Sequence, residues 1–410
     1  MTSQTETRRV PFTSAQLKIL ATLASAVGLR MLGLFLVLPV FTLYGLEFTH
    51  SRFLVGLAFG GYGLTMALLQ IPLGRLSDRI GRRKVLLLGM ALFSLGAFLC
   101  ALPDRFPSSA QIAALIVGRL VQGSGVITSV AFATVADYVP EERRSTAMAF
   151  LGIPIGAAFI LGVIGGPILA GAFGAASLFW LTGFLGLGTL VLIARYLPEV
   201  APRGLEPASM GEILKSRALL PLDAGGFVMN FFMAAFFFYF PLIVTNQHHV
   251  RMSHYYALLL PMVFISAFTM FAFTRGADHG WAKPLAALAF LFFIPSAILL
   301  FRPQALGFDP ARLTAVVAGG TLFYIGFTGL EPILPSLVSR SSPESAYGTG
   351  LGIYNSSQYL GSFAGGSVAG ALAHSREPRA MMVTLMGAAM VGSLMMLAAR
   401  GAPPTPRRRT

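Results

Sequence analysis

The sequence predicts an all-α membrane protein with twelve transmembrane helices in two pseudo-symmetric halves of six. Of its 410 residues, 55% are hydrophobic and only 11% are charged, whereas about a quarter of the residues of a soluble domain are charged. Long apolar stretches follow one another along the chain, and each approaches the roughly 20 residues that a bilayer span requires. The longest polar connection falls between the sixth and seventh of these stretches.

The twelve stretches account for nearly the whole chain. The first is about twice as long as the apolar core of a signal peptide and is interpreted as an uncleaved span. Elsewhere the connections are too short to hold a soluble domain. The predicted spans are residues 17–47, 53–73, 85–102, 110–139, 145–173, 176–196, 217–246, 253–274, 284–301, 312–339, 346–373 and 380–399.

The predicted organisation is a repeated pair of bundles. A tail at 1–16 precedes the first bundle at 17–196, a linker at 197–216 joins it to the second at 217–400, and a basic tail follows at 401–410. The two bundles show weak self-similarity, because Pro140-Glu141 and Pro343-Glu344 precede equivalent spans and 275–283 is a degraded copy of 74–86. Repeated halves are typical of alternating-access transporters.

The net charge of +14 is explained by how the basic residues are distributed between the two sides of the membrane. With the N-terminus inside, 21 of the thirty Lys and Arg fall on the cytoplasmic face, seven fall outside and two lie within spans. This asymmetry follows the positive-inside rule and predicts a multi-pass protein of the inner (cytoplasmic) membrane with both termini in the cytoplasm. Membrane lipids are therefore the expected partners of the basic residues, and nucleic acid is not.

Other classes of protein find no support in the sequence. Cys100 is the only cysteine, so no internal disulfide is possible. No phosphate-binding loop of the ATPase type occurs, so energy is expected to come from a gradient rather than from ATP, and no cofactor is expected. We find no catalytic carboxylate pair, nucleophile elbow or metal-ligand spacing, and we expect no enzymatic activity. The histidines at 248, 249 and 254 are interpreted as an exposed loop, not as a metal site.

Residues 74–86 form the most charged segment between two apolar stretches. Six of these thirteen residues carry charge, which places them in a tight loop outside the bilayer. The segment resembles motif A of the major facilitator superfamily through Gly74-x-Leu76-x-Asp78-Arg79-x-Gly81-Arg82-Arg83.

The family resemblance extends over most of the chain. Leu115-x-x-x-Arg119-x-x-Gln122-Gly123-x-Gly125 is similar to motif B, and Gly162-x-x-x-Gly166-Pro167-x-x-Ala170-Gly171 is similar to motif C of the antiporter branches. Twelve spans fit the shorter drug:proton antiporter type. Segments 28–35, 330–336 and 354–361 look most like the YajR-like branch. Asn230 departs from the histidine usual near that position, and the C-terminal soluble domain of some relatives is expected to be absent.

The resemblance implies a cytoplasmic gate. Asp78 would face the start of span eleven at Ser342-Pro343-Glu344, and Arg82 would pair with Asp137; Gly74, Arg79, Gly81 and Arg83 complete the motif. A carboxylate near a helix N-terminus and an exposed ion pair are each worth roughly a kcal/mol or less. Interactions this weak suit a latch, meaning a set of contacts that holds the cytoplasmic side shut and must break again during transport. The alternative is a topology signal without a gating role.

Three intramembrane charges are candidates for proton coupling. Glu331 is the only acid well inside a predicted span, and burial would favour its neutral form. Arg30 costs roughly 2.5–3.5 kcal/mol in the bilayer and is expected to face a cavity or pair with an acid. Arg119 matches the motif B arginine and, being always protonated, can only tune a neighbouring group. The alternatives are a permanently paired or cytoplasm-facing Glu331 and arginines bonded to backbone carbonyls.

Two further sets complete the predicted site. Small residues at Gly162, Gly166 and Gly171 allow close helix approach and Pro167 bends its helix, which the resemblance associates with a seal against leak; general packing is the alternative. An aromatic cavity with few polar anchors would suit amphipathic compounds. Its candidate residues are Asn230, Phe231, Tyr324, Tyr354, Asn355 and Gln358. For the phenylalanines, helix packing and lipid contact are the favoured interpretation.

The predicted function is proton-coupled efflux of small amphipathic or hydrophobic compounds by alternating access, performed by a monomer. One alternative is uptake or facilitated diffusion of a sugar or organic anion, for which the intramembrane arginines would bind the anion. The other is a membrane sensor or scaffold that does not transport.

Overall fold

The computed structural model describes residues 12–139, 143–199, 216–342, 347–375 and 378–399, and throughout these segments the regular structure is helical. The first half contains α1 (Ser14–Val37), α2 (Phe41–Leu46), α3 (Arg52–Ile80), α4 (Arg82–Cys100), α5 (Gln111–Gly123), α6 (Thr128–Tyr138), α7 (Arg144–Phe173) and α8 (Ala176–Tyr196). The second half contains α10 (Leu220–Asn246), α11 (Tyr255–Gly276), α12 (Ala282–Leu291), α13 (Phe293–Phe301), α14 (Leu313–Ser341), α15 (Tyr347–His374) and α16 (Pro378–Ala398).

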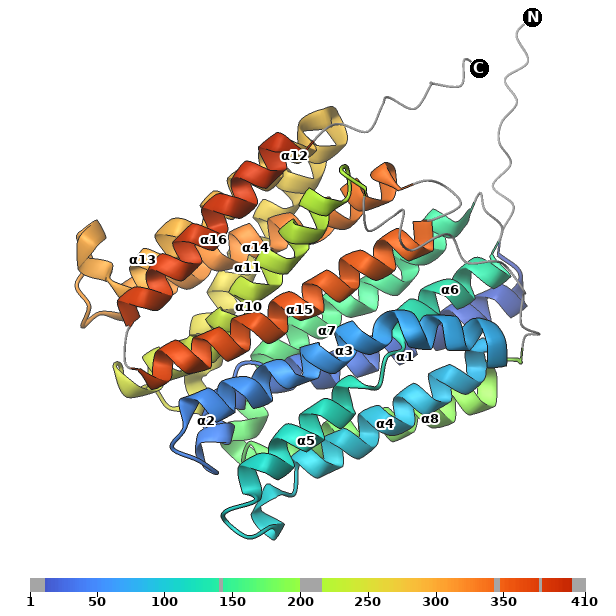
Figure 1. The fold of residues 1–410 in the computed structure, drawn as a ribbon, viewed down its shortest axis with the longest axis horizontal. Coiled ribbons are helices and arrows are strands. Elements are labelled where there is room, and N and C mark those ends of the chain that lie inside the picture. Colours follow the sequence, from blue (N-terminus) through green and yellow to red (C-terminus); the bar gives the residue numbers. More distant parts are fainter. Residues whose placement is uncertain (1–11, 140–142, 200–215, 343–346, 376–377, 400–410) are drawn as a thin grey trace, which may run out of the picture.

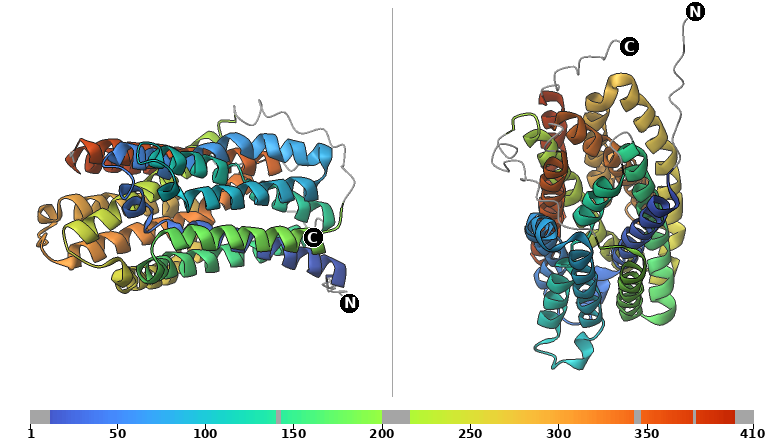
Figure 2. Two further views of the ribbon diagram at one scale, coloured as in Figure 1. Left: turned by 90° about the horizontal axis from the view of Figure 1, so that it is seen from below. Right: turned by 90° about the vertical axis from the view of Figure 1, so that its right-hand side faces the viewer.

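The helices form two bundles that lie side by side and share a direction (Figure 1, Figure 2). Helices α1 to α8 make one bundle and α10 to α16 make the other. The two bundles meet mainly where α15 lies along α3 and where α7 lies beside α11. The first helix begins, and the last helix ends, toward the same end of the molecule (Figure 1).

Ten helices or helix runs are long and apolar enough to cross a membrane. One of them, Met252–Phe301, combines α11, α12 and α13, which turn back on one another through a π-helical segment, η4 (Ala277–Trp281). Helix α15 has 28 residues but is not among the ten, because its centre carries Asn355, Ser356, Ser357 and Gln358. These two cases account for the difference from the twelve predicted spans.

Three predicted spans are broken into two helices. The stretch 17–47 divides between α1 and α2, 110–139 divides between α5 and α6, and 284–301 divides at Phe292. The second break follows from close packing, because a Cβ added to Gly123 would lie 2.2 Å from the Tyr62 carbonyl and one added to Gly125 would lie 2.6 Å from the Gly89 carbonyl. Glycine is a poor helix former, so this segment loses its helix while α3 and α4 approach it closely.

The two bundles approach each other along glycines. A Cβ added to Gly56 of α3 would lie 2.4 Å from the carbonyl oxygen of Gly366 in α15, and one added to Gly60 would lie 2.6 Å from the Phe363 carbonyl. Nearby, Arg52 Nη1 donates a hydrogen bond to the Ala373 carbonyl at 3.0 Å. Backbone-to-backbone contact of this kind requires glycine. It closes the interface at the end where α3 begins and α15 ends.

The phenylalanines of α10 form the core of the second bundle. Phe236 stacks on Phe323 of α14 with ring centroids 3.9 Å apart, and Phe232 stacks on Phe293 of α13 at 4.2 Å. Both α10 rings are buried. Of the two interpretations open from the sequence, helix packing therefore describes these side chains.

Candidate transport site and gate

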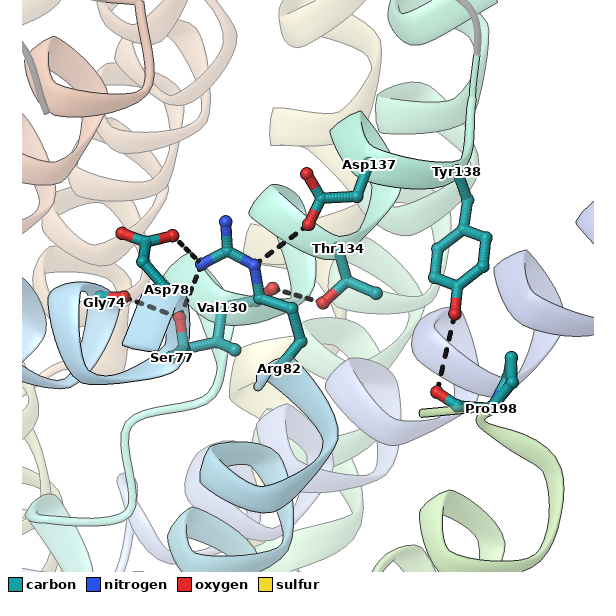
Figure 3. Close-up of polar contacts among 9 residues, drawn as sticks. All are labelled: Gly74, Ser77, Asp78, Arg82, Val130, Thr134, Asp137, Tyr138 and Pro198. Carbon is teal, nitrogen blue, oxygen red and sulfur yellow. Dashed lines mark hydrogen bonds and ion pairs between the residues drawn. The ribbon is translucent and has the colours of Figure 1, made fainter. Parts of the chain in front are cut away.

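The charged segment 74–86, predicted to be a loop, is the end of α3 and the start of α4 with Gly81 alone between them. It carries a compact ion cluster (Figure 3). Arg82 Nε lies 3.0 Å from Asp137 Oδ2, and Arg82 Nη1 lies 2.6 Å from Asp78 Oδ1. Nη1 also donates to Ser77 Oγ at 2.5 Å. Arg82 and Asp137 are mostly buried, with side chains 15% and 12% exposed, while Asp78 is 39% exposed.

Gly81 makes this geometry possible. It ends α3 and begins α4 with φ 102°, a backbone conformation that glycine adopts without a Cβ clash. The chain therefore reverses over one residue, which places the first residue of α4 beside the last turn of α3. Asp137 reaches the cluster from the end of α6. Gly280, with φ 96°, occupies the corresponding place before α12.

The remaining motif A residues lie around the cluster rather than in it. Arg79 is exposed, and a Cβ added to Gly74 would meet nothing within 4 Å. Arg83 Nη2 donates to the Ala194 carbonyl of α8 at 2.5 Å. The proposed contact of Asp78 with the start of span eleven falls largely on residues 343–346, which lie outside the described residues.

Arg30 is fully buried and surrounded by neutral groups. Its Nε donates to the Gly125 carbonyl at 3.2 Å, and its Nη2 approaches Tyr62 Oη at 2.6 Å and Met66 Sδ at 3.0 Å. The guanidinium also lies 5.4 Å from the centroid of the Phe93 ring. The expectation that Arg30 faces a cavity or pairs with an acid is therefore wrong for the described residues. The break between α5 and α6 frees the Gly125 carbonyl to serve as its acceptor instead.

Arg119 is buried between two aromatic rings. Its guanidinium lies 5.0 Å from the Phe41 ring centroid and 4.8 Å from that of Tyr62. Nη1 donates to Gln122 Oε1 at 2.7 Å, while Nε is buried without a hydrogen-bond partner among the described residues. Tyr62 thus touches both buried arginines, and the sequence contained no signal for this role.

Glu331 is exposed, although the sequence argument placed it in a buried site. It lies four residues beyond Phe327 on α14, and Phe327 stacks on Phe159 of α7 across the interface at 5.8 Å. Beyond this contact a Cβ added to Gly152 or Gly156 of α7 would meet nothing within 4 Å. The Glu331 side chain is therefore not enclosed by protein atoms. Among the described residues Glu331 forms no ion pair.

Two tyrosines of α15 lie within electrostatic range of Glu331. One is Tyr354, and the other is Tyr359, which also interacts with Arg30. Tyr359 packs against the core of the first bundle. It was not among the predicted site residues, although it belongs to the 354–361 segment that carried part of the resemblance.

The predicted cavity residues do not line one open surface. Asn230, Phe231, Tyr324 and Tyr354 are buried, and only Asn355 and Gln358 are half-buried. Gln358 Nε2 donates to Tyr354 Oη at 3.2 Å, and Ser362 Oγ donates to Asn230 Oδ1 at 3.4 Å. Most of this set lies where α10 packs on α15, because Gly361 and Gly365 of α15 let it approach the Phe227 and Phe231 carbonyls of α10 closely.

The motif C glycines pack α7 against two neighbours. A Cβ added to Gly166 would lie 2.0 Å from the Leu36 carbonyl of α1, and one added to Gly162 would lie 2.6 Å from Phe35 Cβ. Gly171 lies as close to Ser253, just before α11. Pro167 lies inside α7, which continues past it to Phe173. The contacts are those of close packing.

Comparison with known proteins places the chain in a family. The model of the Major Facilitator Superfamily matches residues 23–366. The chain belongs to the major facilitator superfamily. It is therefore a multi-pass membrane protein of a transporter family and not an enzyme.

Individual relatives agree with this assignment. The chain is 33% identical over 359 residues to the Inner membrane transport protein YajR of Escherichia coli, covering 85% of this chain and 76% of the relative. A Multidrug resistance protein B homolog of Mycobacterium tuberculosis is 34% identical over 180 residues, covering 42% of this chain and 32% of the relative. The crystal structure of the human organic anion transporter MFSD10 superposes with a TM-score of 0.68 at 18% identity, covering 93% and 99% of the two chains. That likeness concerns the fold alone.

Proposed function

We propose that this protein exports small amphipathic or hydrophobic compounds in exchange for protons, by alternating access. The observation that carries the proposal is Glu331, an exposed carboxyl on a spanning helix with no ion-pair partner among the described residues. A carboxyl that reaches open space can exchange its proton with water, whereas a carboxylate held by a cation stays charged. The partial likeness to a multidrug resistance protein supports the same class of substrate.

The exchange uses the proton gradient as its source of energy. Moving one proton across 100 mV yields roughly 2.3 kcal/mol, so a single carboxyl is sufficient for useful export. Glu331 takes up a proton when the site faces outward and releases it when the site faces the cytoplasm. Arg30 and Arg119 stay charged and make the local electrostatic potential positive. Arg30 interacts with Tyr62 and Tyr359, and Arg119 lies over the Tyr62 ring.

The Asp78–Arg82–Asp137 cluster is the proposed cytoplasmic latch. Its ion pairs join the ends of α3, α4 and α6, so opening this face changes their geometry. The proposal includes the orientation argued from charge, with both termini in the cytoplasm and the polar linker joining two six-helix halves. With that orientation, the glycine contacts of α3 with α15 would lie toward the outer side.

Transport in everted vesicles tests the role of Glu331. Ethidium accumulation driven by an imposed proton gradient is expected to fall at least tenfold in Glu331→Gln, because the neutral side chain neither takes up nor releases a proton. Ethidium counterflow, which needs no net proton movement, is expected to persist. Glu47→Gln, the same change at an exposed carboxyl beyond α2, is the matched control. Undiminished proton-driven accumulation in Glu331→Gln would remove this residue from the mechanism.

Transport of an organic anion or sugar is the alternative. It requires the intramembrane arginines to meet the substrate, but Arg30 and Arg119 are 0% and 2% exposed. Substrate-induced proton release by the purified protein distinguishes the two: an exchanger releases protons on binding ethidium, whereas a uniporter for anions does not. A protein that moves no member of a broad panel of drugs, sugars and organic anions in proteoliposomes would instead be a sensor or scaffold.

A further inference from the structure

One carbonyl in the last turn of α15 is bonded by the other bundle. The last four carbonyl groups of an α-helix have no partner within the helix. Ser375 bonds two of them in α15, because its backbone N–H donates to the Ala371 carbonyl at 3.2 Å and its Oγ donates to the Leu372 carbonyl at 3.0 Å. The next carbonyl, that of Ala373, accepts a hydrogen bond at 3.0 Å from Nη1 of Arg52 in α3. Arg52 therefore caps a helix of the opposite bundle.

Arg52 lies at the unfavourable end of its own helix. It is the first residue of α3, and the first turn of α3 contains no acidic residue. A cation near a helix N-terminus is repelled by the positive end of the helix dipole, whereas a cation near a C-terminus is attracted by the negative end. The side chain is half-buried and forms no ion pair among the described residues. Its charge is thus unfavourable for α3 alone and becomes favourable when the end of α15 lies beside it.

The backbone around Arg52 is fitted to the same contact. A Cβ added to Gly370 of α15 would lie 2.6 Å from the Arg52 carbonyl oxygen and 2.7 Å from Gly56 Cα. From this backbone contact the Arg52 side chain extends along α15 to Ala373, which is buried. The guanidinium therefore reaches the end of α15 because the two backbones touch, and it loses this acceptor when they part.

The contact between α7 and α11 joins the same two bundles without such a cap. The N–H of Gly174, with φ 81°, donates to the Ala170 carbonyl at 2.8 Å, so α7 caps its own end with a left-handed glycine. Arg251 lies a few residues before α11, much as Arg52 begins α3, but its side chain is exposed and donates no hydrogen bond among the described residues. Capping across the interface is therefore a property of α3 and α15.

We propose that Arg52 is a detachable cap of α15. It holds α3 against the end of α15 while this side of the protein is closed, and it leaves the Ala373 carbonyl to water when this side opens. Its role in transport rests on the proposed alternating access, in which this is the outer side. Because the acceptor is a neutral carbonyl, opening leaves no unpaired acid behind, and water can bond both separated groups. The cap therefore favours the closed state modestly and reversibly.

Spin-label distances measure this preference in the purified full-length protein in lipid nanodiscs, without substrate or proton gradient. Labels are attached at Ser109→Cys and Gln304→Cys, exposed positions in the segments after α4 and after α13, in a Cys100→Ser background. Arg52→Met keeps an unbranched side chain and removes the charge and the hydrogen bond. It is expected to raise the ratio of open to closed populations about fivefold. Arg52→Lys keeps the charge and is expected to lie between Arg52→Met and the wild type.

Arg52→Glu separates the cap from a role in the stability of α3. An acid in the first turn stabilises α3 but is repelled by the negative end of α15. The ratio of open to closed populations is therefore expected to rise further than in Arg52→Met, by about tenfold over the wild type. Arg251→Met is the matched control and is expected to leave the distances unchanged.

Two results would overturn the proposal. One is a distance distribution that matches the wild type in both Arg52→Met and Arg52→Glu, and a lower unfolding temperature of these variants without a change in distances would leave Arg52 a purely structural residue. The other is an equal shift in Arg251→Met, which would make the effect one of net charge on this side.

Failure of this proposal and failure of the proposed function have different signatures. The distances require no transport, so a shift in Arg52→Met in a protein that does not exchange protons for ethidium would retain the cap and count against the proposed function. Proton-driven ethidium accumulation that is lost in Glu331→Gln, together with wild-type distances in Arg52→Met and Arg52→Glu, would support the function and exclude the cap.

Discussion

The two halves of the molecule carry opposite intramembrane charge, and they hold it differently. In the first half, Arg30 and Arg119 are enclosed by neutral donors, acceptors and aromatic rings. In the second half, Glu331 is exposed and Asp223 is half-buried, and neither forms an ion pair among the described residues. An arginine cannot release its proton in a protein, whereas a carboxyl can. The first half therefore holds fixed charge, and the second holds charge that can change by protonation.

The largest effect should come from removing a fixed charge. Arg30→Met would leave the Gly125 carbonyl and the Tyr62 hydroxyl without their partner inside the bundle. Each unsatisfied buried group costs roughly 1–3 kcal/mol, so we expect a loss of about 3 kcal/mol in the free energy of unfolding. Glu331→Gln loses no described hydrogen bond or ion pair and is expected to change stability by less than about 0.5 kcal/mol.

Unfolding of the purified variants in mixed detergent measures both changes. Equal destabilisation by Arg30→Met and Glu331→Gln would contradict the contrast between the enclosed charge of the first half and the exposed charge of the second.

A medium effect is expected where the two halves meet. Gly56→Val places side-chain atoms against the Gly366 carbonyl, and overpacking of this kind typically costs about 1–3 kcal/mol. Because the strain exists only while α3 and α15 touch, it should shift the population toward a state open at this end. Spin-label distances between the beginning of α3 and the end of α15 should lengthen.

Gly188→Val is the matched control, since a Cβ at Gly188 would meet nothing within 4 Å. A distance distribution in Gly56→Val identical to that of the control would show that the two halves are not separated by this contact.

The smallest effect is expected at the latch. Asp137→Asn removes the negative partner of Arg82 but leaves Asp78 in place. Partly exposed ion pairs are worth up to about 1 kcal/mol, so the change should alter the inward–outward population by no more than about fivefold. Asp309→Asn breaks an exposed pair with Arg312 and should leave the population unchanged.

Thiol-reagent access to a cysteine introduced at Gly352 of α15, in a Cys100→Ser background, reports this population. Equal reagent access to this cysteine in Asp137→Asn and Asp309→Asn would show that the Asp78–Arg82–Asp137 cluster has no gating role and only marks the membrane topology.

The sequence by itself determined the membrane class and the family. Composition and the length of apolar stretches are local properties, so they identified spanning segments without knowledge of their neighbours. The partnership of Arg82 with Asp137, 55 residues apart, was available from the family motif and agrees with the geometry of the cluster. The ten apolar helices are two fewer than the twelve predicted spans. One predicted span is α15, which is polar at its centre, and two others are counted as one because α11 to α13 form a continuous run.

Only the tertiary structure decided what each intramembrane charge meets. Arg30 takes its acceptors from α3 and from the break before α6, and hydropathy gave no sign that a free carbonyl would lie there. The exposure of Glu331 depends on which helices pack around α14, and the Phe159–Phe327 stacking one turn away is a contact with the other bundle. The physical reason is the same in each case: residues remote in sequence determine solvation and partners, and solvation and partners decide whether a charge is fixed or can move.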